Sequence, residues 1–380
     1  MSQLPAPKTA LVVTTIFEPE FLAGYIENIE RHGHASEVVL IVIPDRKTPA
    51  SVAQRCAHFR SRGFRIECPG LEEQESFLRK FPGMSERIPY DSDNRRNVGF
   101  LMALERGADV LVTIDDDNFC LPDSDFVGEH AIAGRNCALA EVSSSDGWFN
   151  LGSLLQTEPA IDIYPRGFPY SARKRARRIE TSAPVERQVA VNAGLWLSDP
   201  DVDAITRLAI APRVASAKAG SLLLASDTWS PLNTQNTALA RDAVSAYYYV
   251  RMGYALGGMS IDRFGDILSG YFVQKCAKSL GHAIRVGSPV ADHRRTPHNL
   301  FKDLYHELAG MVIIEDLLPW LMEVPLGEGN YADAYLALAD LIEERSGKFK
   351  GFVWDQGARE FLAATADNMR AWVAAVRAIG

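Results

Sequence analysis

Three consecutive aspartates, Asp115 to Asp117, are the residues of this sequence with the clearest chemical capacity. Adjacent carboxylates repel one another unless a positive group lies among them, and a hard divalent cation with oxygen ligands would supply that charge. Mn²⁺ or Mg²⁺ keeps coordination positions for phosphate oxygens and stabilises a departing diphosphate. We therefore predict a metal site that binds the paired phosphates of a nucleotide. A solvated acidic turn is the alternative interpretation.

Positive charge is concentrated in one segment of the chain, residues 166–178. Guanidinium groups pair with phosphate oxygens in a two-pronged manner, so this segment could bind a diphosphate. Arg166 and Arg173 lie in or beside a stretch rich in Pro, Gly and aromatic residues, 164–170, which predicts a shaped turn. Lys174, Arg175, Arg177 and Arg178 fit a solvated loop or a protein-binding patch at least as well.

Two further candidates follow later in the chain. Asp262 and Asp266 precede an apolar helix predicted over residues 267–280, and Asp266 could act as a base or accept a sugar hydroxyl. His293 follows a strand-like run at 283–286, and its neutral imidazole could complete the metal site. A structural role is the alternative for a single histidine.

The elements that must position these residues alternate between strand and helix. Short β-branched apolar runs predict buried strands, and apolar residues on one face predict helices. The last of these strands leads directly into Asp115. The predicted strands cover residues 10–14, 38–43, 64–68 and 110–114, and the predicted helices cover 21–29 and the segment from Asn94 to Gly107.

This alternation predicts an α/β fold with a Rossmann-like, mostly parallel sheet flanked by helices. Ligands of such folds gather beyond the carboxyl ends of the strands. The candidate nucleotide-binding residues are Thr14, Thr15, Asp45, Arg96, Asp115 and Asp116.

We expect residues 1–325 to form one domain, with a nucleotide-binding half, 1–120, and a sugar and acceptor half, 121–325. Residues 326–380 are expected to form a helical C-terminal extension. Tyr331, Tyr335, Leu338 and Leu341 fall on one helix face, and an Ala-rich helix is predicted over 361–379. Internal packing or subunit contact in a homo-oligomer would use these faces.

Composition excludes several classes of protein. Hydrophobic residues at 47% and charged residues at 23% of the 380 are typical of a globular protein. The net charge of −8 argues against general nucleic-acid binding. Five scattered cysteines without a CxxC pair suit reduced thiols, and we identify neither a signal peptide nor an apolar run of the roughly 20 residues that would span a membrane. We therefore expect a cytoplasmic protein.

Four ordered stretches resemble the reversibly glycosylated polypeptides, a family that includes the plant UDP-arabinopyranose mutases. TIDDDNF (113–119) is similar to the family's TIDDDCF metal motif, and YPRGFPYSAR (164–173) to its RGYPFSLR segment. NAGLWLSDPDVDA (192–204) is similar to HGLWLNIPDYDA, and PLNTQNTALARDA (231–243) to PMCGMNLAFDREL. The resemblance covers residues 10–320 in order and implies a GT-A-like glycosyltransferase fold.

The resemblance also implies roles for individual residues. Arg166 matches an arginine that is reversibly glycosylated in the family, and Arg173 matches a second arginine needed for activity. With Asp266 these form the implied catalytic set. Asp115, Asp117 and His293 form the implied metal site, because His293 falls where the family has a histidine after its PYIW stretch.

The sequence also departs from the family pattern near the expected sugar site. The family's RYDDMWAGW becomes RFGDILSGY (263–271), so Gly265 replaces one carboxylate while Asp266 remains. Its CGMN becomes NTQN (233–236), and the helices after Pro325 have no counterpart among the matched stretches. These changes leave the sugar and the acceptor open.

The chemistry predicted is metal-assisted cleavage of the bond between sugar C1 and phosphate in a nucleotide sugar, with a UDP-sugar preferred. A mutase would return the sugar to the same diphosphate in the other ring form, pyranose or furanose. A glycosyltransferase would pass it to a small-molecule or peptide acceptor. A non-catalytic sugar-nucleotide-binding scaffold is the alternative from another class.

Overall fold

The structure is a computed structural model that describes residues 6–380. Within these residues a 12-stranded sheet forms the centre of the molecule, and a separate two-stranded sheet pairs β12 (Tyr254–Leu256) with β13 (Met259–Ile261). The strands of the large sheet are β1 (Thr9–Thr15), β2 (Val38–Pro44), β3 (Ile66–Glu67), β4 (Val110–Asp115), β5 (Asn118–Cys120), β6 (Asn136–Ser144), β7 (Leu155–Glu158), β8 (Ile179–Ser198), β9 (Arg213–Ala217), β10 (Leu222–Leu224), β11 (Asn236–Ala240) and β14 (Ala283–His293).

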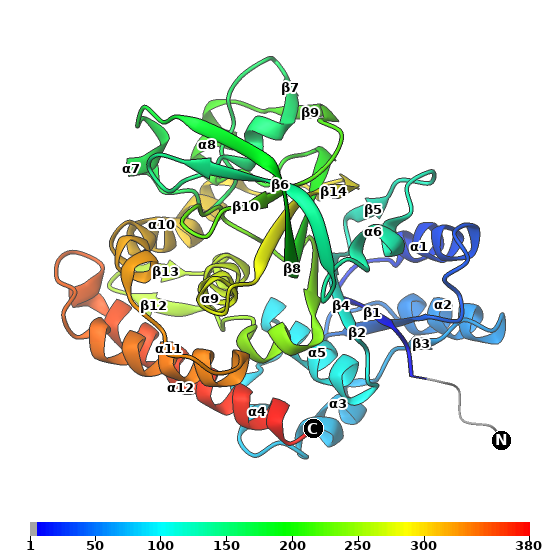
Figure 1. Cartoon of the computed structure of the whole chain (residues 1–380). Coiled ribbons are helices and arrows are strands. Elements are labelled where there is room, and N and C mark those ends of the chain that lie inside the picture. Colours follow the sequence, from blue (N-terminus) through cyan, green and yellow to red (C-terminus); the bar gives the residue numbers. More distant parts are fainter. Residues whose placement is uncertain (1–5) are drawn as a thin grey trace.

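Helices cover both sides of this sheet (Figure 1). The α-helices are α1 (Glu20–Arg31), α2 (Ala50–Ser61), α3 (Leu71–Leu78), α4 (Met84–Arg87), α5 (Arg96–Glu105), α6 (Phe126–His130), α7 (Tyr170–Arg173), α8 (Ala204–Ala209), α9 (Gly265–Ser279), α10 (Leu300–Glu323), α11 (Tyr331–Ser346) and α12 (Ala358–Arg377). Short 3₁₀ turns are η1 (Asp93–Arg95), η2 (Leu151–Leu154), η3 (Arg241–Ala246) and η4 (Trp354–Gln356).

The N-terminal part of the sheet is parallel. β1 lies between β2 and β4, and β3 extends the sheet beyond β2. The strands predicted in this half are confirmed, although β3 is only two residues long, and the helices predicted there correspond to α1 and α5. Because parallel neighbours end at the same edge, the carboxyl ends of β1, β2 and β4 meet there and bring Thr15, Asp45 and Asp115 to one side of the molecule.

Alternation along β1 divides its side chains between two hydrophobic cores. Leu11 and Val13 belong to the core shared with α1 and α2, and Ala10 and Val12 belong to the core shared with α5. A Cβ added to Gly99 of α5 would lie 2.4 Å from Cγ1 of Val12, closer than two carbons can approach. Glycine therefore lets α5 lie directly on β1, and this contact helps to place its first residue, Arg96, beside the strand ends.

The remainder of the sheet is mixed. β11 runs antiparallel to both β4 and β8, β6 runs antiparallel to β8, and β14 runs parallel to β8. The predicted α/β class with a sheet flanked by helices is confirmed, but the mostly parallel sheet is correct only for its N-terminal part. Alternation of short strands with helices at residues 1–120 carried no information about the long antiparallel strands that follow.

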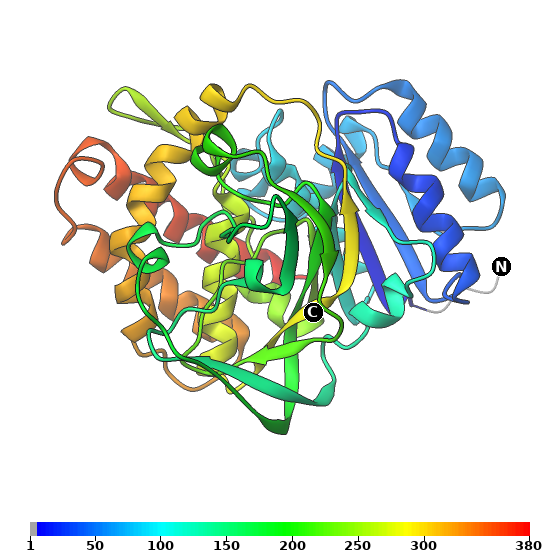
Figure 2. The ribbon, with the colours of Figure 1, turned by 90° about the horizontal axis from the view of Figure 1, so that it is seen from above.

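The C-terminal helices lie on the side of the molecule away from α1 and α2 (Figures 1 and 2). The helices predicted after Pro325 are present as α11 and α12, and their apolar faces join the same core as α5 and α9. Trp372 of α12 is fully buried and its Nε1 donates to the carbonyl of Val244, 2.9 Å away. The proposed boundary at residue 325 lies between α10 and α11, and the division into two domains stays a prediction.

Among the residues described, no helix combines the length and the apolar character needed to cross a bilayer.

Candidate functional site

A cavity of about 540 Å³ opens at the carboxyl ends of β1, β2 and β4. Its walls also include residues of the loop before η1, the turn before α9, and the segment after β14. Most of the side chains selected from the sequence line this single cavity. They are Thr14, Thr15, Asp45, Arg96, Asp115, Asp116, Asp117, Arg166, Asp266 and His293.

Asp115, at the end of β4, is bound by a buried arginine. Nη2 of Arg96 lies 2.6 Å from Oδ1 of Asp115 and 3.2 Å from Oγ1 of Thr14. Its Nη1 donates to Oγ1 of Thr113 and to the carbonyl of Ile114, both at 2.7 Å. Arg96 is thus largely committed to the protein itself, and in this arrangement it positions Asp115.

Burial raises the pKa of Asp115 to about 7, with the carboxylates of Asp117 and Asp266 adding to the rise and Arg96 opposing it. Burial also raises the pKa of Asp116 to about 6, although its Oδ2 accepts a hydrogen bond of 2.5 Å from Thr15 Oγ1. Both shifts reflect several negative groups in one partly desolvated place. A cation in this cavity would relieve that repulsion.

Asp117 faces His293 across the cavity wall, with Oδ2 of the aspartate 3.3 Å from Nε2 of the imidazole. Nδ1 of His293 lies against the carbonyl of Asp199, so Nδ1 carries a proton and donates to that oxygen. Burial disfavours the charged imidazole, but the hydrogen bond and charge of Asp117, with the charge of Asp201, outweigh it and raise the pKa of His293.

These two side chains fit a divalent cation. A backbone carbonyl that fixes Nδ1–H leaves Nε2 as the metal-facing nitrogen, which is the usual arrangement of a histidine ligand. Oδ2 of Asp117 and Nε2 of His293 lie 3.3 Å apart, so both side chains could bind one cation. Within residues 6–380 no group of three or more His, Cys, Asp or Glu side chains is assembled for a metal, so substrate oxygens would complete the coordination.

Arg166 lies between two carboxylates that also line the cavity. Its Nε and Nη2 contact the two oxygens of Asp201 at 3.0 and 3.2 Å, and its Nη2 and Nη1 contact the two oxygens of Asp266 at 2.7 and 3.1 Å. Burial disfavours the guanidinium charge, but the two carboxylates outweigh it and hold the pKa of Arg166 well above its usual range. The three charges sum to −1.

Asp201 is a site residue that the sequence analysis did not select. Burial would raise the pKa of this carboxyl, but Arg166 and a hydrogen bond of 2.8 Å from Asn233 lower it to about 2. The residue lies within the matched stretch 192–204, so its position next to Pro200 was visible in the sequence. No spacing rule connects it with Arg166, 35 residues earlier.

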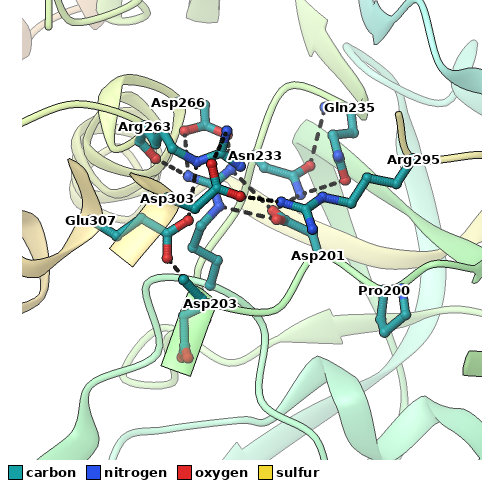
Figure 3. A network of polar contacts seen from close by, with 12 residues as sticks. Pro200, Asp201, Asp203, Asn233, Gln235, Arg263, Asp266, Arg295, Asp303 and Glu307 are labelled. Atoms are coloured by element: carbon teal, nitrogen blue, oxygen red, sulfur yellow. Dashed lines mark hydrogen bonds and ion pairs between the residues drawn. The ribbon is translucent and has the colours of Figure 1, made fainter. Parts of the chain in front are cut away.

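A second layer of charges supports this cluster (Figure 3). The carbonyl of Arg263 accepts from Nη1 of Arg166, and Arg263 adopts a left-handed backbone with φ of 55°, which is unfavourable for a residue with a side chain. Its side chain contacts Glu307 at 3.1 Å and Asp303 at 3.5 Å. Contacts with α10 thus hold Arg263, which lies just before α9. The first turn of α9 includes Asp266, which lines the cavity.

Arg173 does not line the cavity, although the sequence placed it in the catalytic set. Its Nη2 lies 2.5 Å from Oδ2 of Asp203, and its guanidinium lies 3.7 Å from the ring centroid of Tyr170. Asp203 in turn accepts a hydrogen bond of 2.9 Å from the Tyr170 hydroxyl. In this structure Arg173 fixes the segment 164–173, and the neighbouring basic residues 174–178 also lie outside the cavity.

The sequence profile of the reversibly glycosylated polypeptides matches residues 37–380. The chain belongs to the reversibly glycosylated polypeptide family. The resemblance identified from four motifs is thereby confirmed, and the family match extends through α11 and α12 to the last residue.

Named members of this family are similar over most of their length. UDP-arabinopyranose mutase 1 of Oryza sativa subsp. japonica is 26% identical over 293 residues, which cover 76% of this chain and 72% of that protein. UDP-arabinopyranose mutase 3 of Arabidopsis thaliana is 29% identical, covering 69% and 67%. Probable UDP-arabinopyranose mutase 1 of Pisum sativum is 26% identical, covering 99% and 93%.

Solved structures with some likeness in arrangement include glucosyl-3-phosphoglycerate synthase from Mycobacterium tuberculosis in complex with Mn²⁺ and UDP-glucose. That structure is 12% identical, with a TM-score of 0.38, covering 81% of this chain and 78% of the other. S. aureus TarS in complex with UDP-GlcNAc is also 12% identical with a TM-score of 0.38, covering 90% and 73%. Values this low support no conclusion about ligands or activity.

Proposed function

We propose that this chain is a UDP-sugar mutase, which cleaves the bond between sugar C1 and the diphosphate and re-forms it after the sugar has changed ring form. Family membership and relatives named UDP-arabinopyranose mutase support this proposal. UDP-arabinopyranose is therefore the first substrate to test. The interconverted forms are the pyranose and the furanose.

The observation that carries the proposal is that two charged centres share one cavity. The Asp117–His293 pair and the cluster of Arg166, Asp201 and Asp266 both line it, and we assign the first to the diphosphate and the second to the sugar. The segment 199–201 joins them, because the carbonyl of Asp199 holds His293 while the side chain of Asp201 holds Arg166. A nucleotide sugar has two matching parts, an anionic diphosphate and a sugar that becomes electron-poor at C1.

At the diphosphate end we propose Mn²⁺ or Mg²⁺ as cofactor, with Asp117 and His293 as ligands and Asp115 beside them. The cation, when bound, supplies charge that stabilises the departing diphosphate. Thr14, Thr15 and Asp45, at the ends of β1 and β2, are proposed to contact the nucleotide. They line the cavity on the side of the N-terminal strands.

At the sugar end the Arg166 cluster carries a net charge of −1 in a buried setting. Cleavage of the C1–phosphate bond leaves positive charge on C1 and on the ring oxygen. Preorganised carboxylates stabilise such charge more strongly in a buried site than in water. Asp266 and Asp201 are proposed to do so here, and Arg166 holds both of them in place.

Covalent capture of the sugar by Arg166, which the family resemblance implies, faces an energetic barrier in this arrangement. A guanidinium must lose a proton before a nitrogen can attack C1, and moving that proton to a carboxylate such as Asp266 costs about 12 kcal/mol from the ordinary acidities. The ion pairs with both carboxylates increase that cost. We therefore propose that Arg166 acts as a cation and does not bind the sugar covalently. A mass measurement of the intact protein would detect glycosylation of Arg166.

The test is turnover of UDP-arabinopyranose by the purified protein with Mn²⁺, in parallel with other UDP-sugars and with GDP- and dTDP-sugars. We expect an isomeric UDP-sugar without any acceptor and without stoichiometric release of UDP. Intact-protein mass should show no stable sugar adduct on Arg166. Release of UDP in proportion to an added acceptor would favour transfer, and absence of any nucleotide-sugar turnover would refute both forms of the proposal.

A glycosyltransferase acting on a small-molecule or peptide acceptor is the second candidate, and Gly265 motivates it. A Cβ at position 265 would lie 2.5 Å from the carbonyl of Val250 and 2.7 Å from the ring of Tyr249. The carboxylate that the family carries here is thus excluded by local contacts, which changes the sugar end of the cavity. A non-catalytic scaffold is a third option, and binding of a nucleotide sugar without turnover of any of the sugars tested would favour it.

The cytoplasmic location and contact between copies through α11 and α12 stay predictions. Size-exclusion chromatography with light scattering would decide the oligomeric state.

A further inference from the structure

One carboxylate of the cavity differs from all the others in its contacts. Asp115, Asp116, Asp117, Asp201 and Asp266 each contact a basic side chain, an imidazole or a hydroxyl.

The remaining acidic side chains of the cavity wall, apart from one, also have hydrogen-bond or ion-pair partners. Asp45 and Asp262 accept backbone N–H groups, and Asp91 pairs with Lys47 at 3.4 Å. Within residues 6–380 Asp93 alone among the carboxylates that line the cavity has neither a hydrogen bond nor an ion pair.

Asp93 is one of the residues that line the cavity. It is the first residue of η1, the turn that leads into α5, and it is open to the cavity. The charged groups that act on it are Arg96, Asp262, Arg263 and Asp266. Although the residue is exposed, loss of bulk water around the carboxyl within the cavity raises its pKa, with Asp262 and Asp266 adding to the rise and the two arginines opposing it.

The proposed reaction needs a proton carrier. When a pyranose becomes a furanose, a sugar hydroxyl forms a bond to C1 and loses its proton, and the former ring oxygen leaves C1 and gains one. The C1–phosphate bond breaks before these events and re-forms after them. The exchange is redox-neutral, and a single carboxyl group can take the first proton and deliver it to the second oxygen.

The carboxylates already described are poorly suited to this task. Asp201 and Asp266 are both held by Arg166, and a proton on either would weaken a buried ion pair. Asp115 is held by Arg96. Asp93 can gain or lose a proton without breaking any contact within the protein.

We propose that Asp93 is the acid–base residue that carries the proton between the attacking hydroxyl and the ring oxygen of the sugar. The inference rests on the proposed mutase function and adds a catalytic residue to it. No sequence pattern and no contact with another side chain indicate a catalytic role for Asp93. The role is inferred from its unpaired carboxyl in the cavity that it shares with the other charged residues.

The test separates bond cleavage from ring exchange. UDP-arabinopyranose labelled with oxygen-18 in the bridge between C1 and phosphate scrambles its label when that bond breaks, the terminal phosphate rotates and the bond re-forms through another oxygen. We expect Asp93→Asn to retain label scrambling within about threefold of the wild-type rate, while formation of the furanose falls by about 100-fold or more. Asp93→Glu, which keeps a carboxyl, should restore part of the loss.

Two results would overturn the inference. Wild-type furanose formation by Asp93→Asn would show that no proton passes through this carboxyl. A parallel fall of scrambling and furanose formation, with weaker binding of UDP by calorimetry, would make Asp93 a nucleotide contact. If the wild-type protein neither scrambles the label nor forms an isomer, the proposed function itself fails and this inference with it.

A matched surface substitution and a folding check complete the design. Asp123→Asn makes the same chemical change at a side chain that is 99% exposed, and it should leave both rates unchanged. Asp93→Asn should melt at or above the wild-type temperature at pH 7, because a carboxyl whose pKa is raised in the folded state destabilises that state when it is ionised. Thermal unfolding followed by circular dichroism measures this.

Discussion

Arg166 and Asp201 form a two-pronged ion pair, 3.0 Å from Nε to Oδ1 and 3.2 Å from Nη2 to Oδ2, in which neither side chain is more than 9% exposed. Asp266 contacts the same guanidinium from α9. The guanidinium of Arg166, between two carboxylates, joins three distant parts of the chain in the wall of the cavity.

Asp201→Asn should destabilise the protein by about 3 kcal/mol, because removal of one partner leaves a buried charge only partly compensated. The remaining contact with Asp266 limits the loss. Urea unfolding at pH 7 measures the change. Asp123→Asn, in an exposed pair with Arg31, should change the free energy of unfolding by less than about 1 kcal/mol. Equal effects of the two substitutions would contradict the buried pair.

Arg173→Lys should lower kcat without weakening UDP binding, because Arg173 lies outside the cavity and acts by fixing the segment that carries Arg166. Lysine cannot both stack on Tyr170 and keep the contact with Oδ2 of Asp203, and we expect a loss of stability of about 1 kcal/mol. Isothermal titration with UDP and Mn²⁺ measures binding, and Arg175→Lys, at an exposed position, is the control. Weaker UDP binding by Arg173→Lys alone would instead place Arg173 at the nucleotide.

Removal of divalent cations with EDTA should abolish turnover, and Mn²⁺ should restore it. Asp117→Asn and His293→Gln should each weaken Mn²⁺ binding in the presence of UDP by at least about tenfold, because each removes a proposed ligand. Electron paramagnetic resonance of free Mn²⁺ measures this directly. His34→Gln changes a histidine that contacts Asp125 away from the cavity and should bind Mn²⁺ normally. Normal Mn²⁺ affinity in both ligand variants would remove the metal site from the proposal.

His130 should make the protein acid-sensitive. It is fully buried, and its Nε2 donates to Asn236 while its Nδ1 accepts from Asn192. Burial lowers its pKa to about 3, with the hydrogen bond to Asn236 opposing the shift. The unfolded chain therefore binds a proton that the folded chain does not, between the ordinary histidine pKa and about 3.

Stability should consequently fall as the pH decreases through that window, with His130 contributing about 1.4 kcal/mol per pH unit. Urea unfolding at several pH values compares the wild type with His130→Gln. The variant should be less stable at pH 7, where it loses well-placed hydrogen bonds, but its stability should depend less steeply on pH. Parallel pH profiles would show that His130 is not the residue responsible.

The sequence by itself determined the N-terminal α/β half and the candidate residues on it. Buried β-branched runs such as 38–43 can satisfy their backbone only in a sheet, and parallel strands end together, so Thr15, Asp45 and Asp115 had to approach one another. The motifs around Asp115 and Arg166 were sufficient to indicate the family.

The tertiary structure decided which of these charges meet. The role of Arg173, the commitment of Arg96 to Asp115, and the clamp of Asp201 and Asp266 on Arg166 depend on contacts between segments up to 100 residues apart. Local propensity and residue spacing do not predict such contacts. The sequence of a charged residue is the same whether its side chain is solvated or forms an ion pair. Asp93 could not be selected from the sequence either, because what distinguishes it is that its carboxylate has no hydrogen-bond or ion-pair partner among the described residues.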